Sequence, residues 1–211
     1  MLISRIELNM GNAKTRHAVV VPQVLHAAIE VCFPDKAEKD RKLWRIDRLR
    51  DSMYLLLLSA ETPDFTEFAR QFCSEGVTGE TKDYTHLLNS IRDGASLRFR
   101  LRANPTHSVT RDNESRGKVY AHITVEQKLN WLIKKAQCCG FRLDERLFDV
   151  VETDYLRFWR SKTSPPVEIG VAVYEGLLEV ADRELFIHAL THGIGRAKAY
   201  GCGLLTVASL P

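Results

Sequence analysis

The segment GIGRAKAYGCGLL, at residues 193–205, concentrates four of the chain's twelve glycines around two cations. Glycine permits positive φ and lets a bulky ligand approach the backbone N–H groups. Those N–H groups and the side chains of Arg and Lys all bind phosphate oxygens. One glycine would indicate only the end of a helix, but four interleaved with cations favour a phosphodiester contact. We predict that the segment binds RNA through Gly195, Arg196, Lys198, Gly201 and Gly203.

The patterns on either side of this segment exclude two common nucleotide-binding motifs. A helical pattern begins at Asp182 and precedes the glycines, and an apolar strand pattern at 204–208 follows them. A dinucleotide fingerprint has the opposite order, because its glycines follow a strand and open a helix. The segment also lacks the GK[ST] ending of a P-loop.

The first half of the chain predicts a strand–helix–strand–strand–helix–strand order, which is ferredoxin-like. Residues 2–10 alternate as a strand does, and Pro22 begins a helix that runs to about residue 33. Two strands are expected at 43–49 and 53–60, and a helix at 65–73. The alternating segment 97–103 would supply the last strand of this half.

The second half repeats the order less clearly after a polar, aperiodic segment at 104–118. We expect a short strand at 119–123, a helix capped by Thr124, and strands at 147–158 and 167–174. Glu175-Gly176 predicts a hairpin turn into a strand at 177–181. The predicted fold class is therefore α+β, with two tandem ferredoxin-like (RRM-like βαββαβ) domains. They would comprise residues 1–103 and 119–211, joined by a linker at 104–118.

The composition indicates a cytoplasmic protein whose charge alone does not reveal a partner. The 211 residues carry a net charge of only +3, so a basic surface must come from local clustering. The cysteines, at positions 32, 73, 138, 139 and 202, are odd in number and form no CxxC motif, which favours reduced thiols. There is no secretory signal pattern and no apolar run of the ~18 residues that a membrane span needs.

Four motifs in order resemble those of the CasE family, the CRISPR precursor-RNA endoribonucleases of Cascade (type I-E), over nearly the whole chain. Leu25-His26, with Ile29 and Phe33-Pro34, is similar to the family's helix that carries the catalytic histidine. The segment LRFRLRANP at 97–105 resembles its FRLRANP strand, and 174–177 resembles its FEGVL segment. The glycine-rich segment is the fourth motif. Gln23 is a departure, because many family members have tyrosine three residues before the histidine.

The resemblance implies metal-independent cleavage of CRISPR precursor RNA beside repeat hairpins, without a cofactor. The 2′-OH of the upstream nucleotide would attack, leaving 2′,3′-cyclic phosphate and 5′-OH ends. Family behaviour also implies that the protein keeps its cleaved hairpin and joins other Cascade subunits, with no membrane partner. An expected lack of metal agrees with the sequence, since no histidines have ligand spacing with the cysteines.

The resemblance gives His26 and Lys162 catalytic roles, with Arg157 and Arg160 beside them as RNA-binding residues. A histidine can exchange a proton near neutral pH, and cations can stabilise the charge that develops on the phosphorane. The alternatives remain open: a histidine on a helix flank is often only structural, and the three cations could form an ordinary solvated loop.

Arg98, Arg100 and Arg102 line one face of the strand predicted at 97–103. Like charges two residues apart repel one another, so a polyanion or a carboxylate is expected over them. We predict RNA binding by all three, with a structural carboxylate or simple solubilisation as the alternatives. For the whole protein, the alternatives to an endoribonuclease are a non-cleaving RNA-hairpin-binding subunit and, less favoured, an anion-binding ferredoxin-like domain.

Overall fold

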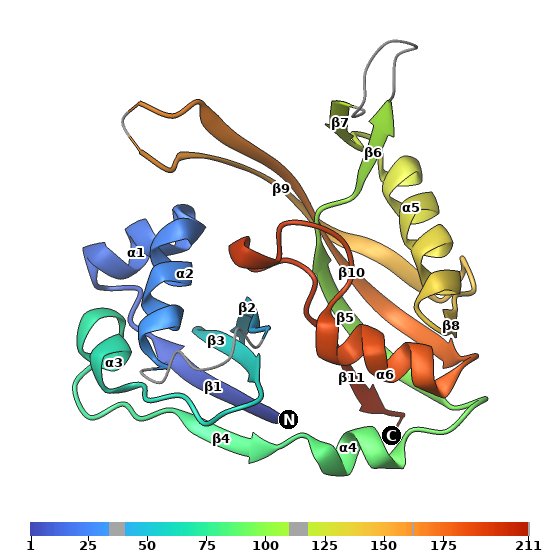
Figure 1. The fold of residues 1–211 in the computed structure, drawn as a ribbon, viewed down its shortest axis with the longest axis horizontal. Coiled ribbons are helices and arrows are strands. Elements are labelled where there is room, and N and C mark those ends of the chain that lie inside the picture. The colour runs from blue at the N-terminus through green and yellow to red at the C-terminus, as the bar shows by residue number, and fades with distance from the viewer. Residues whose placement is uncertain (34–40, 110–117, 162, 211) are drawn as a thin grey trace.

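The structure is a computed structural model that describes residues 1–33, 41–109, 118–161 and 163–210. Figure 1 shows two sheets, each with its own helices, lying next to one another. No helix in the described part of the chain is long and apolar enough to cross a membrane.

The first sheet is antiparallel, with the strand order β2-β3-β1-β4. This order, with a helical segment after the first strand and another after the third, is the ferredoxin-like arrangement predicted for the first half. One apolar core fills the space between the sheet and its helices, and it includes Ile6, Leu25, Leu55 and Phe68. The elements are β1 (Leu2–Leu8), α1 (Ala13–Val20), α2 (Pro22–Val31), β2 (Leu43–Leu49), β3 (Ser52–Ser59), α3 (Thr66–Phe72) and β4 (Glu80–Asp83).

The second sheet repeats the arrangement, with the order β11-β5-β10-β8 and with β9 also paired to β10. Helices α5 and α6 pack on it through a second core that includes Leu132, Tyr174 and Phe186. Its elements are β5 (Ser96–Ala103), α5 (Val125–Cys138), β8 (Phe141–Arg142), β9 (Phe148–Trp159), β10 (Pro166–Val180), α6 (Arg183–His192), the 3₁₀ turn η1 (Lys198–Tyr200) and β11 (Leu205–Ser209). The predicted fold class is confirmed.

Local capping signals place both helices of the second half as predicted. The Thr124 side chain accepts the Gln127 N–H at 3.2 Å, and the Gln127 side chain accepts the Thr124 N–H in return, which is a complete capping box. Asp182 accepts the Leu185 N–H at 3.0 Å and begins α6. These signals work from sequence because each needs only residues three positions apart.

The strand at 97–103 belongs to the second sheet, contrary to the expectation that it completes the first. β5 pairs with β10 and β11, and the first sheet instead takes β4 as its edge strand. All four residues of β4 are exposed, so β4 has no apolar alternation to reveal it. A linker at 104–118 would separate β5 from the elements it pairs with. Between β4 and β5 lies α4 (Thr85–Ser90), and a division of the chain there would keep both sheets whole.

Two further predictions for the second half are wrong. The expected linker contains strand β6 (Thr106–Val109), which pairs with β7 (Lys118–Ala121), while residues 110–117 lie outside the described ranges. The expected turn at Glu175-Gly176 lies inside the continuous strand β10. Gly176 serves packing instead, because a Cβ there would come within 2.2 Å of the Leu147 carbonyl oxygen.

The two halves touch at their sheets and through a long ribbon. Leu43 and Leu58 of the first sheet are part of the core of the second half. In the second half, β9 and β10 continue as a two-stranded ribbon that is paired as far as Trp159 and Pro166. Figure 1 shows this orange ribbon extending from the second sheet to the side of the molecule where α1 and α2 lie.

Candidate functional site

Helix α2 holds His26 on a backbone fixed by core contacts. Leu25 and Ile29 are fully buried, so the helix cannot turn about its axis without exposing them. The His26 side chain lies on the flank and is 31% exposed, with its Nδ1 4.0 Å from Glu30 Oε1. Glu30 also accepts a hydrogen bond from Lys42 Nζ at 3.0 Å. The imidazole is therefore accessible, and it lies close to the Glu30 carboxylate, whose charge Lys42 partly neutralises.

A groove of about 840 Å³ lies between α2 and the β9–β10 ribbon. Its α2 wall is mainly apolar and includes Val24, Ala27 and Val31, while the ribbon contributes two arginines and Trp159. Gln23, where the family resemblance would imply tyrosine, lines this groove. His26 follows Gln23 by one helical turn but is not itself one of the lining residues described. The residues of the groove are His17, Val21, Gln23, Val24, Ala27, Ala28, Val31, Gln71, Phe72, Arg157, Phe158, Trp159 and Arg160.

The two ribbon arginines have different partners. Arg157 lies 5.6 Å from the Trp159 ring centroid and pairs with Glu168, its Nε 3.4 Å from a carboxylate oxygen. Arg160 donates from Nε to the Tyr200 hydroxyl at 2.9 Å. Arg160 thereby ties the ribbon to η1, in the middle of the glycine-rich loop. Both arginines thus meet α2 across one groove, and their predicted RNA contacts stay a prediction, whereas Lys162 lies outside the described residues.

The glycine-rich loop, residues 193–203, runs from the end of α6 to the start of β11. Its four glycines all have positive φ, between 75° and 93°. The loop is closed at its base, where the Ile194 N–H donates to the Gly203 carbonyl at 2.9 Å. Arg196 is exposed, and Lys198 is half-buried. Burial lowers the pKa of the Lys198 ammonium, and the charge of Arg41 lowers it further.

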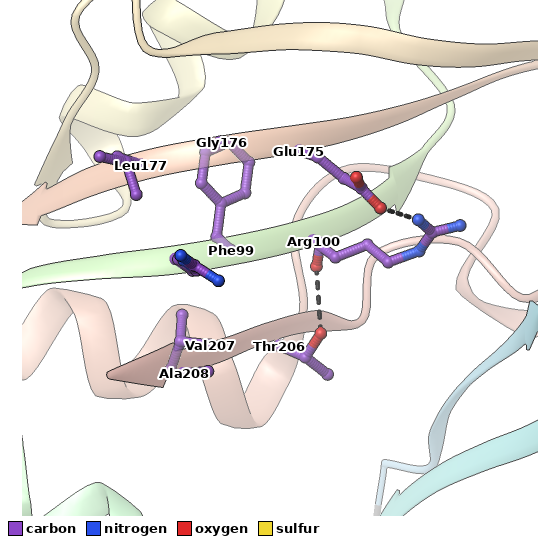
Figure 2. A pocket seen from close by; sticks show the side chains of 9 residues that line it. Phe99, Arg100, Glu175, Gly176, Leu177, Thr206, Val207 and Ala208 are labelled. Carbon is purple, nitrogen blue, oxygen red and sulfur yellow. Dashed lines mark hydrogen bonds and ion pairs between the residues drawn. The ribbon is translucent and has the colours of Figure 1, made fainter. Parts of the chain in front are cut away.

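The predicted tri-arginine face divides into three different environments. Arg100 pairs with Glu175 and with Asp47, and Figure 2 shows its side chain pointing toward Glu175. Arg102 donates from Nη1 to the Tyr200 and Gly201 carbonyls at 3.2 and 3.3 Å, and these hydrogen bonds attach the glycine-rich loop to β5. Arg98 is exposed and, together with Arg100, lines a hollow over β5, β10 and β11.

The structure therefore brings together only part of the predicted set. At Arg100 the structure shows the alternative of a structural carboxylate, supplied by Asp47 and Glu175. The contacts of Arg100 and Arg102 are structural ones, and RNA binding by the three arginines stays a prediction. No sequence pattern pointed to Tyr200 or Trp159, because their places at the groove depend on the ribbon reaching across to the other half. Among the described residues, no group of three or more His, Cys, Asp or Glu could hold a metal ion.

Comparisons with known proteins give matches along nearly the whole chain. A family model described as CRISPR associated protein matches residues 1–209. The CRISPR-associated endoribonuclease Cse3 of Thermus thermophilus is 27% identical over 220 residues, covering 99% of this chain and all of that protein. The CRISPR system Cascade subunit CasE of Escherichia coli is 27% identical over 197 residues, covering 88% and 91% of the two chains.

Solved structures give the same result. A structure of Cse3 bound to 19 nt RNA has a TM-score of 0.83 at 28% identity, covering 99% of this chain and 100% of that one. Thermus thermophilus Cse3 bound to an RNA representing a pre-cleavage complex has a TM-score of 0.81 at 26% identity, with 98% of each chain covered.

Proposed function

Because the chain belongs to the CRISPR-associated protein family that includes the CasE and Cse3 proteins, we propose that it is an endoribonuclease that cleaves CRISPR precursor RNA beside repeat hairpins. The observation that carries the proposal is the groove in which helix α2, the ribbon arginines and Gln23 meet. One wall of the groove is helix α2, which carries His26 one turn after Gln23, and the other is the ribbon with its two arginines. Acid–base cleavage of a phosphodiester needs such a histidine together with cations.

His26 exchanges protons in the proposed reaction. The 2′-oxygen of the nucleotide before the scissile bond attacks phosphorus and loses its proton, and the P–O5′ bond breaks. The leaving 5′-oxygen takes up a proton. The products are a 2′,3′-cyclic phosphate and a 5′-OH. Imidazole suits this exchange because its ordinary pKa lies near the working pH.

Arg157 and Arg160 stabilise the negative charge that develops on the phosphorane. Arg160 is already oriented by the Tyr200 hydroxyl, so little reorganisation is needed when RNA binds. We keep Lys162 as a third candidate on the strength of the family resemblance alone.

The glycine-rich loop binds the hairpin backbone in this proposal. Arg196 is exposed at the loop surface, and Lys198 lies half-buried in η1. We also propose that the chain stays in the cytoplasm as a Cascade subunit with its hairpin bound, as its CasE relative is named a Cascade subunit.

A second candidate function is binding of the RNA hairpin without cleavage. Gln23 favours it, because glutamine in the groove can donate and accept hydrogen bonds but has no phenolic proton. If tyrosine is essential to the family's chemistry, this chain would bind and not cut.

The deciding experiment incubates the chain with repeat RNA from its own CRISPR array and identifies the product ends. We expect cuts beside the hairpin, with a 2′,3′-cyclic phosphate on one product and a 5′-OH on the other. Binding without product would favour the second candidate function. A failure to bind any repeat hairpin would contradict both.

A further inference from the structure

Strand β2 holds the glycine-rich loop at successive residues. A Cβ on Gly193 would meet the Leu43 side chain at 2.8 Å, and a Cβ on Gly201 would meet the Trp44 ring at 2.8 Å. Leu43 and Trp44 point to opposite faces of the strand. One strand of the first half therefore touches both ends of a loop that belongs to the second half.

The next residue, Arg45, fixes the exit of the loop through hydrogen bonds. It is 1% exposed, and its Nε and Nη2 donate to the two oxygens of Asp47, both at 2.7 Å. Its Nη1 donates to the carbonyls of Arg100 and Leu204, both at 2.9 Å. Its Nη2 also donates to Thr206 Oγ1 at 2.9 Å. A guanidinium has five N–H donors, and all five are used.

Asp47 completes the connection between the halves. It is 4% exposed and accepts a further hydrogen bond from Arg100 Nε at 3.2 Å. Arg100 in turn pairs with Glu175 of β10, the pair drawn in Figure 2. Burying an ion pair is weak support for stability, because well-packed apolar residues often do as well. What the guanidinium fork adds is a fixed direction for each acceptor.

We propose that Arg45, oriented by Asp47, is a positioning residue for RNA cleavage. It holds the glycine-rich loop and β11 at a set place relative to the half that carries His26. The start of helix α2 meets the loop directly, since its N-cap residue Val21 packs in one apolar cluster with Tyr200. The inference rests on the proposed cleavage function, and it extends that function to residues that touch no RNA. A misplacement of about 1 Å far from the reacting atoms can cost roughly a hundredfold in rate.

The first test measures amide hydrogen exchange in the glycine-rich loop in the absence of RNA, so it does not depend on cleavage. Arg45→Lys keeps the charge but has three donors in place of five, so the five acceptors on Asp47, Arg100, Leu204 and Thr206 cannot all be satisfied. We expect faster amide hydrogen exchange at Ile194, whose N–H closes the base of the loop on the Gly203 carbonyl, and at Gly203, whose N–H donates to the Arg102 carbonyl of β5 at 2.7 Å. Arg5→Lys is the matched control, because Arg5 forms an ion pair with Glu80 at the surface of the first sheet. Unchanged exchange in Arg45→Lys would overturn the inference.

The second test measures single-turnover cleavage with enzyme saturating over RNA, so that a change in affinity does not affect the rate. We expect Arg45→Ala to be about tenfold to a hundredfold slower. Millimolar guanidinium should restore part of that rate. The control variant Arg5→Ala should cleave at the wild-type rate, and added guanidinium should not change that rate. Should Arg45→Ala fail to fold, Arg45→Met/Asp47→Leu removes both buried charges together and is expected to fold and cleave slowly. Cleavage by a folded Arg45 variant within twofold of the wild-type rate would overturn the inference, as would an Arg45→Ala loss that guanidinium does not relieve. A wild-type chain that fails to cleave would instead contradict the proposed function.

Discussion

Replacing Gly201 with alanine should destabilise the fold by more than its backbone conformation alone explains. Gly201 has a φ of 75°, and a left-handed conformation costs a residue with a Cβ about 1–2 kcal/mol. The new Cβ would also lie 2.8 Å from the Trp44 ring. Trp44 is 2% exposed, so the ring cannot move away freely, and overpacking of this kind costs about 1–3 kcal/mol.

Gly76→Ala is the matched control for this prediction. Gly76 has a φ of 80°, and a Cβ there would have no neighbour within 4 Å. Both variants share the conformational cost and the same loss of freedom in the unfolded chain. The difference between them, which we expect to be about 1–3 kcal/mol, therefore reports the contact with Trp44.

The assay is urea unfolding of the wild type and both variants at one temperature, with hairpin affinity measured in parallel. We expect Gly201→Ala to lose both stability and affinity, and Gly76→Ala to lose only a little stability. A double-mutant cycle with Trp44→Leu should show coupling between Gly201 and Trp44. Equal destabilisation by the two alanines, or no coupling in the cycle, would refute the contact.

Three further predictions concern chemistry, charge and pH. Cleavage of repeat RNA should persist in excess EDTA, and activity that disappears on chelation and returns with Mg²⁺ would contradict this. Arg196→Ala should lower the slope of log affinity against log salt concentration by roughly one, as loss of one phosphate contact does. Lys198→Ala should lower this slope by the same amount. The control Arg70→Ala, on α3, should leave it unchanged. Burial raises the pKa of the Cys202 thiol to about 11, so the folded state keeps a proton that the unfolded state loses above its ordinary pKa of 9.0. The free energy of unfolding should therefore fall as the pH rises through 9 toward 11. In urea unfolding at pH 10, Cys202→Ala should lessen this fall by about 1 kcal/mol. Replacing the exposed Cys138 with alanine should not change it.

The parts of the fold that the sequence predicted are those set by neighbouring residues. The capping box at Thr124 and the cap at Asp182 each depend on residues within one helical turn. The fully buried Leu25 and Ile29 stripe likewise gives helix α2 and the placement of His26 on its flank. The glycine-rich loop was recognisable from composition alone, and all four of its glycines have positive φ in the structure.

The remainder depends on which distant segments pair. The alternation in β5 is the same whichever sheet receives it, so the pattern at 97–103 could not choose between the two halves. Arg45 looked like one more polar residue of an alternating strand, and its acceptors at Leu204 and Thr206 are more than 150 residues away. The groove likewise forms only because a ribbon from the second half reaches α2.

The most direct measurement of the central claim is a paired one on His26→Ala. Hairpin affinity and the single-turnover rate are measured on the same preparation, with His86→Ala, an exposed histidine of α4, as the control. The account predicts a rate lower by about 10²–10⁴-fold with affinity unchanged, because acid–base catalysis is lost while the cations and the loop remain. A His26→Ala variant that cleaves at nearly the wild-type rate, or that loses affinity as much as rate, would contradict it.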